Sequence, residues 1–177
     1  APHLRRGKGI ATMIKPTMTP SSSNVLINMA QDGRVAVICA APEIGYGQDT
    51  VLAQMAAEAI GVSLDYVTVP RTDTALTPYN GPVASSRTTY HMGNAILTAG
   101  AEIRDEVLGL AGETLGVDPE ALELRDGAIC DLDGVVQITL KELLAKHSGE
   151  GYSITAGWVM PANVPRRDSG TSGWRMV

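Results

Sequence analysis

Two loops of this chain carry residue types that can hold an anion. The first is the segment Glu43–Thr50, in which Gly45, Tyr46 and Gly47 stand just before a helical pattern. Glycines let backbone N–H groups approach a ligand closely, and a helix N-terminus adds unpaired N–H groups at the positive end of its dipole. The third glycine of a dinucleotide fingerprint and the lysine of a nucleotide-cradling loop are both missing here. The pattern therefore predicts either a phosphate contact or a tight turn in which Asp49 caps the helix.

The second loop, Asn80–Thr89, places four hydroxyls and one guanidinium before the longest helical pattern in the sequence. These groups belong to Ser85, Ser86, Arg87, Thr88 and Thr89. A cation is unfavourable beside the positive end of a helix, so Arg87 favours the presence of a bound anion. The alternative is ordinary capping of the helix by a Ser or Thr hydroxyl, with Arg87 in solvent. Spacing alone leaves both interpretations open.

A sheet and several helices are needed to position these loops. Residues 25–30 and 35–40 have strand composition and are joined at Gln31–Arg34 by a turn sequence typical of a hairpin. Further strands are expected at 5–15, 66–69, 122–124, 128–130, 135–138 and 152–160. Apolar residues at helical spacing predict helices at 49–60, 87–115 and 139–147, the last capped by Thr139. The combination predicts an α+β fold, a two-layer domain of mixed or antiparallel sheet with two to three packed helices.

The length of 177 residues allows one well-buried domain. We expect this domain to span residues 1–160 and an irregular tail to occupy 161–177. The net charge of −5 comes without a basic stripe, which argues against nucleic acid or an anionic membrane as a partner. No apolar stretch is long enough to cross a bilayer.

The two cysteines and three histidines do not form a recognisable metal site. Cys39 and Cys130 are too far apart in sequence for zinc-ligand spacing and too few for a disulfide framework. The histidines are scattered along the chain. We therefore expect two buried thiols in a reducing, cytoplasmic compartment and no metal ligand from these side chains.

Four groups of residues follow one another along the chain at compatible spacing. They are Arg6-Gly7-Lys8-Gly9-Ile10-Ala11, Asp32-Gly33-Arg34-Val35, Ile44-Gly45-Tyr46-Gly47, and Ala84-Ser85-Ser86-Arg87-Thr88-Thr89 with Gly93-Asn94-Ala95. In this order they resemble the molybdenum-binding large subunit of the xanthine dehydrogenase/aldehyde oxidase family. The similarity runs from about Arg5 to about Leu144, and several ordered motifs are more specific than any one of them.

In that family the two loops surround a molybdopterin cofactor, which bacterial members often carry as its cytosine dinucleotide. The resemblance implies cofactor contacts from Gly45, Tyr46 and Gly47 in the first loop. In the second loop it implies contacts from Ser85, Ser86, Arg87, Thr88 and Thr89. The family commonly has Gln where this chain has Tyr46, so a single hydroxyl replaces the paired donor and acceptor of an amide.

The resemblance also implies a reaction, the water-dependent oxidation of an aldehyde or N-heterocycle at molybdenum. In the family a glutamate in a Gly-x-Gly-Glu motif is the general base, and electrons leave through iron–sulfur clusters to flavin. Neither that motif nor a cluster-binding cysteine set nor a flavin motif occurs in this sequence, so we expect no catalytic residue here.

The chain is then expected to be a fragment or split subunit that is inactive alone. Its expected partners are the remaining molybdenum-subunit polypeptide, iron–sulfur and FAD subunits, and a small-molecule substrate whose identity the residues leave open. Two alternatives are a non-catalytic assembly module of such a complex and an unrelated phosphate- or nucleotide-binding domain.

Overall fold

The computed structural model describes residues 3–13, 22–147 and 154–159 and has an α+β fold, as expected. One sheet has the strand order β3-β2-β1-β7 and a smaller one the order β4-β5-β6. The strands are β1 (Asn24–Met29), β2 (Val35–Cys39), β3 (Val67–Thr68), β4 (Leu122–Arg125), β5 (Ala128–Asp131), β6 (Val136–Thr139) and β7 (Ile154–Val159). The helices are α1 (Gln48–Ile60), α2 (Gly93–Leu115) and α3 (Leu140–His147), and a π-helical turn, Thr88–Met92, leads into α2.

The expected hairpin of β1 and β2 forms the centre of the larger sheet. The strands pair antiparallel from Val25↔Cys39 to Met29↔Val35. Alternate residues of both strands are buried, as the two-residue period of a half-covered sheet requires. The turn closes with Gly33 in the left-handed region, where its N–H donates to Ala30 O at 2.9 Å. Apolar side chains on one face therefore point together toward the helices.

Strand β7 lies beside β1 although it is the last strand of the chain. It pairs antiparallel with β1 over its full length, from Asn24↔Val159 to Met29↔Ile154. On the opposite edge, β3 adds a short parallel pairing to β2. The sheet is therefore mixed, and its centre is shielded on both sides by neighbouring strands.

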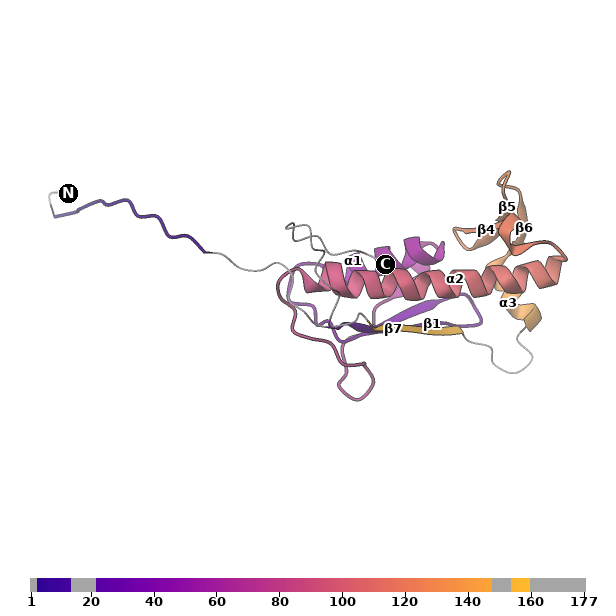
Figure 1. Cartoon of the computed structure of the whole chain (residues 1–177), viewed down its shortest axis with the longest axis horizontal. Helices are drawn as coiled ribbons and strands as arrows, with labels where there is room; N and C mark the ends of the chain where they lie inside the picture. Colours follow the sequence, from indigo (N-terminus) through magenta and orange to yellow (C-terminus); the bar gives the residue numbers. More distant parts are fainter. Residues whose placement is uncertain (1–2, 14–21, 148–153, 160–177) are drawn as a thin grey trace, which may run out of the picture.

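Helices α1 and α2 cover one side of the larger sheet (Figure 1). They pack closely where Gly100 of α2 meets Ala59 of α1, because a Cβ at Gly100 would lie only 2.7 Å from the Ala59 Cβ. Helix α1 ends at Gly61, whose left-handed backbone (φ 95°) lets its N–H donate to Ala57 O. Helix α2 is longer than α1 and extends past the sheet toward β4–β6 (Figure 1).

The smaller sheet and α3 stand at the far end of α2 (Figure 1). As expected, Thr139 caps α3: its hydroxyl accepts the Glu142 N–H, and the Glu142 carboxylate accepts from the Thr139 N–H and hydroxyl. This sheet joins the rest of the domain at Gly61, whose carbonyl accepts the Gly127 N–H at 3.2 Å. Gly61 also lies so close to β4 that a Cβ there would be 2.2 Å from Leu124 O.

One expectation about the elements was wrong. Residues 5–13, expected to be part of a strand, are exposed and have no strand pairing, because strand composition does not supply a partner. The helix expected at 87–115 is present over residues 88–115, and its first residues, Thr88–Met92, are π-helical. The expected tail, 161–177, lies outside the described residues, so the domain boundary stays a prediction.

Cys39 and Cys130 are buried free thiols, as expected. Among the described residues, none of the helices has the length and apolar character to cross a membrane.

Candidate functional site

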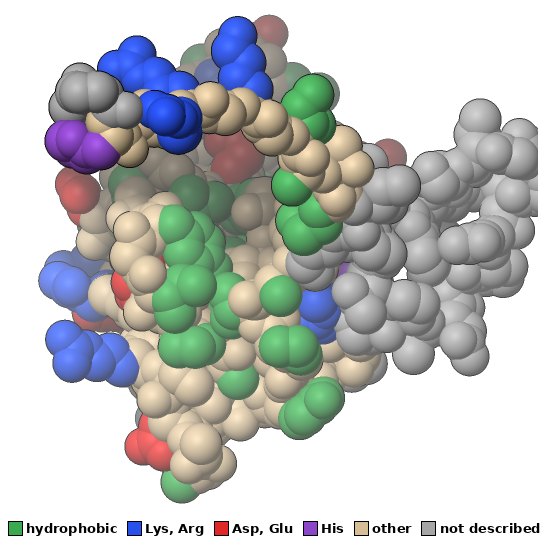
Figure 2. Space-filling view, turned by 90° about the vertical axis from the view of Figure 1, so that its left-hand side faces the viewer, with side chains coloured by type: hydrophobic (Ala, Val, Ile, Leu, Met, Phe, Trp, Pro, Cys, Tyr) green, Lys and Arg blue, Asp and Glu red, His purple; other side chains and the backbone are tan. Residues whose placement is uncertain are grey.

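The two anion-binding loops meet at one end of the domain. The first lies between β2 and α1, and the second runs into the π-helical turn that leads into α2. The Tyr46 hydroxyl of the first loop is 3.0 Å from Thr88 Oγ1 of the second. Between them is a pocket of about 190 Å³ lined by Ile44, Tyr46 and residues 83–89. Figure 2 shows this end of the molecule, where hydrophobic side chains gather near the middle of the face.

Six of the eight predicted site residues line this pocket. They are Tyr46, Ser85, Ser86, Arg87, Thr88 and Thr89. Gly45 and Gly47 flank Tyr46 in the chain and do not line the pocket. Their backbones have φ values of 101° and 77°, which glycine adopts without strain. The two loops singled out from the sequence thus lie together, with the glycines shaping the first loop around Tyr46.

The backbone of the second loop is held in an uncommon conformation. Ser85 and Ser86 have φ values of 54° and 59°, in the left-handed region that residues with a Cβ seldom adopt. The loop is fixed on either side by hydrogen bonds from Arg87 N to Ala84 O and from Tyr90 N to Ser86 O, both 3.0 Å. Backbone strain of this kind is concentrated at functional sites, as are π-helical turns.

Arg87 is buried, with 2% of its surface exposed, so the interpretation that places it in solvent is wrong. Its guanidinium donates to Ser22 O at 2.8 Å, Pro82 O at 3.2 Å and Ser23 Oγ at 3.4 Å. It lies against Gly81, where a Cβ would be 2.9 Å from the guanidinium carbon. Burial lowers the pKa of Arg87, while the neighbouring Tyr79 raises it. Arg87 therefore ties the second loop to the segment that enters β1.

A buried glutamine continues this polar structure into the first loop. Gln48 Nε2 donates to Ala41 O, so the amide presents Oε1 to the Tyr46 hydroxyl. The Tyr46 hydroxyl has one proton, and Gln48 Oε1 can only accept. The Thr88 hydroxyl therefore donates to Tyr46 Oη across the gap between the loops. One chain of hydrogen bonds joins α1, the first loop and the start of α2.

The buried polar side chains of the described residues are concentrated at this end of the domain. They are Ser23, Gln48, Arg87, Thr88 and His91. Ser23 donates to Asn80 Oδ1 at 2.7 Å, and Asn80 Nδ2 donates to Ala40 O at 3.0 Å. Sequence reasoning missed Ser23, Gln48 and Asn80, because a polar residue beside a loop carries no sign of its burial. Only the close approach of β1, β2 and the second loop reveals their role.

Glu43 also has a larger role than its place at a strand end indicated. Its carboxylate accepts the backbone N–H groups of Gly45, Tyr46, Gly47 and Asp49. Desolvation raises the pKa of Glu43, but these four hydrogen bonds outweigh it and the pKa is lowered. Asp49 was one candidate for the cap of α1, but the cap position is Gly47, with no side-chain capping bond. A signal was present in the sequence, an acid two residues before the first of two glycines.

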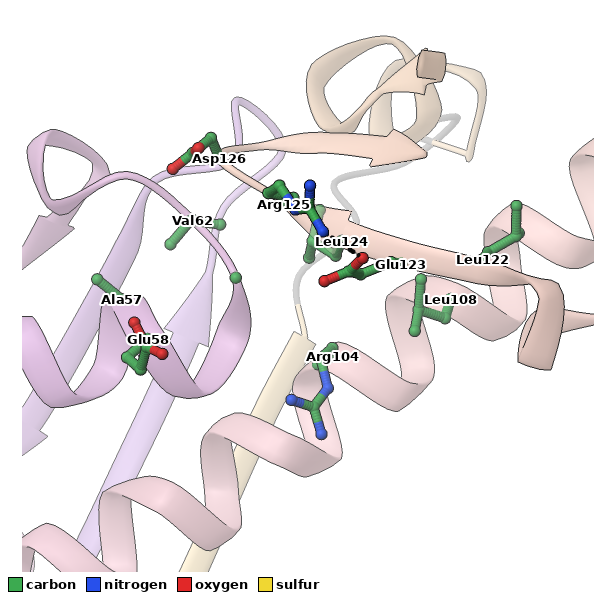
Figure 3. A pocket seen from close by; sticks show the side chains of 11 residues that line it. Ala57, Glu58, Val62, Arg104, Leu108, Leu122, Glu123, Leu124, Arg125 and Asp126 are labelled. Carbon is green, nitrogen blue, oxygen red and sulfur yellow. Dashed lines mark hydrogen bonds and ion pairs between the residues drawn. The ribbon is translucent and has the colours of Figure 1, made fainter. Parts of the chain in front are cut away.

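A larger cavity of about 500 Å³ lies away from the loops, between the end of α1, α2 and β4 (Figure 3). Its two arginines already have partners within the protein. Arg125 pairs with Glu123 at 2.8 Å, and Arg104 Nη1 donates to Ala59 O at 3.3 Å. In the described part of the chain no three His, Cys, Asp or Glu side chains gather as a metal site. The pocket between the two loops is therefore the candidate site.

The domain is thus an α+β fold with two loops that meet at the start of a long helix, and comparison with known proteins identifies its family. The chain matches the molybdopterin cofactor-binding domain over residues 1–173 and belongs to that family. This match confirms the expected kinship with the molybdenum-binding subunits of xanthine dehydrogenase and aldehyde oxidase type.

Two curated relatives are the xanthine dehydrogenase molybdenum-binding subunit of Escherichia coli O157:H7 and subunit gamma of the 6-hydroxypseudooxynicotine dehydrogenase complex of Paenarthrobacter nicotinovorans. Each is 33% identical to this chain, over 132 and 119 residues respectively. The first match covers 72% of this chain and 18% of the relative, and the second 67% and 15%. The chain thus spans less than a fifth of the length of these relatives.

Solved structures share the fold. Quinoline 2-oxidoreductase from Pseudomonas putida 86 superposes with a TM-score of 0.64 at 24% identity, covering 78% of this chain and 19% of the other. CO dehydrogenase from Oligotropha carboxidovorans gives 0.65 at 23% identity, covering 77% and 18%. At these identities the similarity concerns the fold alone.

Proposed function

We propose that this chain supplies one wall of the molybdopterin site in a molybdenum-dependent oxidoreductase that acts on an aldehyde or an N-heterocycle. The observation that carries the proposal is the meeting of the two loops, with the Tyr46 hydroxyl 3.0 Å from Thr88 Oγ1 beside a pocket lined by residues of both. In a family that binds molybdopterin, a pocket built from the two motif-bearing loops is the natural place for the cofactor.

The size of the pocket supports the idea of a single wall. Sites for small molecules and cofactors typically have volumes of roughly 300–1,000 Å³. The pocket between the loops measures about 190 Å³ and is shallower than a site that encloses its ligand. The rest of the molybdenum-subunit polypeptide would then complete it, together with the glutamate base that this sequence lacks. Iron–sulfur and FAD subunits would complete the electron path.

The chemistry of the second loop suits a phosphorylated ligand. Ser86 and Thr89 are exposed at the pocket, and the first N–H groups of a helix have no partner within the helix. Hydroxyls and helix N–H groups together favour phosphate oxygens. We propose that Ser85, Ser86, Thr88 and Thr89 contact the cofactor directly, carried as the cytosine dinucleotide, and that Arg87 keeps their backbone in place.

The first loop would close the same wall from the other side. Tyr46 presents its ring and hydroxyl to the pocket, and Gly45 and Gly47 set the course of the chain on either side of it. When bound, the cofactor supplies the redox chemistry at molybdenum. The residues of this chain bind and orient it, and the chain alone is expected to be inactive.

Metal analysis and pterin fluorescence on the protein purified with its natural partner chains test this proposal. We expect molybdenum and pterin in equal amounts, and lower pterin occupancy in Ser86→Ala and Thr89→Ala. Ser63→Ala, on the turn before β3, is the control and should keep full occupancy.

Three results would count against the proposal in different ways. Co-purification of partner chains without molybdenum or pterin would favour an assembly module. A bound phosphate or nucleotide without pterin would favour an unrelated phosphate-binding domain. Oxidation of an aldehyde or purine by this chain alone would refute the claim that the base lies elsewhere.

A further inference from the structure

The first loop is wrapped around a carboxylate from its own chain. Glu43 Oε1 accepts the N–H groups of Gly45 at 2.6 Å, Tyr46 at 2.9 Å and Gly47 at 3.2 Å. Glu43 Oε2 accepts the N–H of Asp49 at 3.3 Å. Four backbone donors thus converge on one side chain, in the arrangement by which successive N–H groups enclose an anion.

The glycines make this arrangement possible through their conformation. Gly45 and Gly47 have φ values of 101° and 77°, and a Cβ at either position would meet no atom within 4 Å. Crowding therefore does not require glycine at these positions. The left-handed backbone does, because it turns consecutive N–H groups toward the carboxylate.

These hydrogen bonds limit what the first loop can offer a ligand. Each backbone N–H is a single donor, and the N–H groups of residues 45–47 are already directed at Glu43. A phosphate at the same place would have to displace a carboxylate of like charge. In the second loop, by contrast, the Arg87 guanidinium donates to the carbonyls of Ser22 and Pro82 and to the Ser23 hydroxyl.

We infer that Glu43 is a positioning residue: it occupies the anion-binding amides of the first loop and so aims Tyr46 at Thr88, leaving phosphate contact to the second loop. The Tyr46 N–H is itself one of the Glu43 contacts, and its hydroxyl is the group that reaches Thr88. This inference rests on the proposed function for the identity of the ligand. The Glu43 contacts themselves can be tested without the cofactor.

Backbone amide NMR signals of the ¹⁵N-labelled full chain provide the test, with inorganic phosphate and acetate as probes. In the wild-type chain, phosphate should leave the amide signals of Gly45, Tyr46 and Gly47 unmoved. In Glu43→Ala these amide N–H groups lose the carboxylate that accepts from them, and the Thr88 amide signal should move from its wild-type position. Added acetate should then shift the three first-loop signals until they reach a plateau, and should return the Thr88 signal toward its wild-type position. Glu58→Ala, which removes an exposed acid from α1, is the matched control and should behave as wild type.

Two results would overturn the inference. Phosphate that shifts the first-loop amides of the wild-type chain as strongly as those of Glu43→Ala would show that Glu43 does not hold them. A Thr88 signal that is unchanged in Glu43→Ala would show that Glu43 does not position Tyr46. If Glu43→Ala does not fold, the wild-type chain still decides the point, because the Gly45 amide signal must titrate together with the Glu43 carboxyl.

The same measurements separate this inference from the proposed function. Normal Glu43 contacts in a protein that never carries pterin would leave the inference standing and remove the proposed function. Full pterin occupancy together with first-loop amide signals that shift with phosphate would remove the inference and leave the proposed function standing. In the complex, Glu43→Ala should lower pterin occupancy several-fold, and acetate should restore part of it.

Discussion

The close contact between Gly61 and β4 can be tested by adding one methyl group. Gly61 ends α1 with φ 95°, and a Cβ there would lie 2.2 Å from the Leu124 carbonyl oxygen. A left-handed backbone costs a residue with a Cβ about 1–2 kcal/mol. Forcing a methyl group into a packed contact costs about 1–3 kcal/mol more. We expect Gly61→Ala to lower the free energy of unfolding by about 2–5 kcal/mol, the sum of the two costs.

Gly116→Ala provides the matched control. Gly116 ends α2 with φ 70° and donates to Gly112 O at 2.8 Å, as Gly61 donates to Ala57 O, but a Cβ there meets no atom within 4 Å. Only the backbone cost of about 1–2 kcal/mol should remain. Urea unfolding followed by circular dichroism measures both variants. An equal loss in the two would refute the conclusion that the end of α1 is pressed against the smaller sheet.

The remaining predictions concern the site and the cap of α3. Tyr46→Phe removes the hydroxyl that donates to buried Gln48 Oε1, and it should lower the free energy of unfolding, measured by urea unfolding, by about 1–3 kcal/mol. The control Tyr66→Phe removes a hydroxyl from an exposed turn and should change this free energy little. The pKa of Glu43 is lowered in the folded chain. Its contribution to the free energy of unfolding is therefore complete above the pKa of an unfolded glutamate, about 4.3, and is lost as the pH falls through the pKa of the folded chain. The difference in the free energy of unfolding between wild type and Glu43→Gln should therefore shrink in acid, and a difference that grows there would contradict this sign. Asp49 and Arg71, which line a hollow together with Glu43, are present in both proteins. Thr139→Ala should lower the free energy of unfolding by about 0.5–2 kcal/mol, because it removes the cap of α3. It should also raise the pKa of Glu142, since the hydrogen bond from the Thr139 hydroxyl is the largest cause that lowers this pKa. An NMR titration that finds the Glu142 pKa unchanged would contradict the capping role.

The elements that could be predicted are those whose pattern is local. The hairpin of β1 and β2 and the helix α1 follow from apolar periodicity and a glycine at each turn. Residues 5–13 show the limit of such reasoning, because a strand needs a partner that composition cannot name. The same limit hides the pairing of β7 with β1, which joins segments more than a hundred residues apart in sequence.

The candidate site could be predicted as two loops but not as a set of contacts. Glycine and hydroxyl patterns pointed to Tyr46 and Ser85–Thr89, and these residues do line one pocket. The patterns did not show that Gln48 is buried or that Arg87 bonds to carbonyls of its own chain. Both facts depend on which backbone segments meet at this end of the fold, and that information is tertiary.

The π-helical turn at Thr88–Met92 places one extra residue between the second loop and α2. In this turn the Gly93 N–H bonds to Thr88 O, five residues back, so the turn holds one residue more than an α-helical one. Removing that residue would restore the α-helical count and leave the packing of α2 in register. Because five residues of a π turn and four of an α turn both bring the chain round the helix axis about once, the segment before the turn would keep its direction. A single-codon deletion here would therefore change the hydrogen bonds and side chains of the turn while the second loop and α2 keep their places, so this stretch can vary without rebuilding the domain.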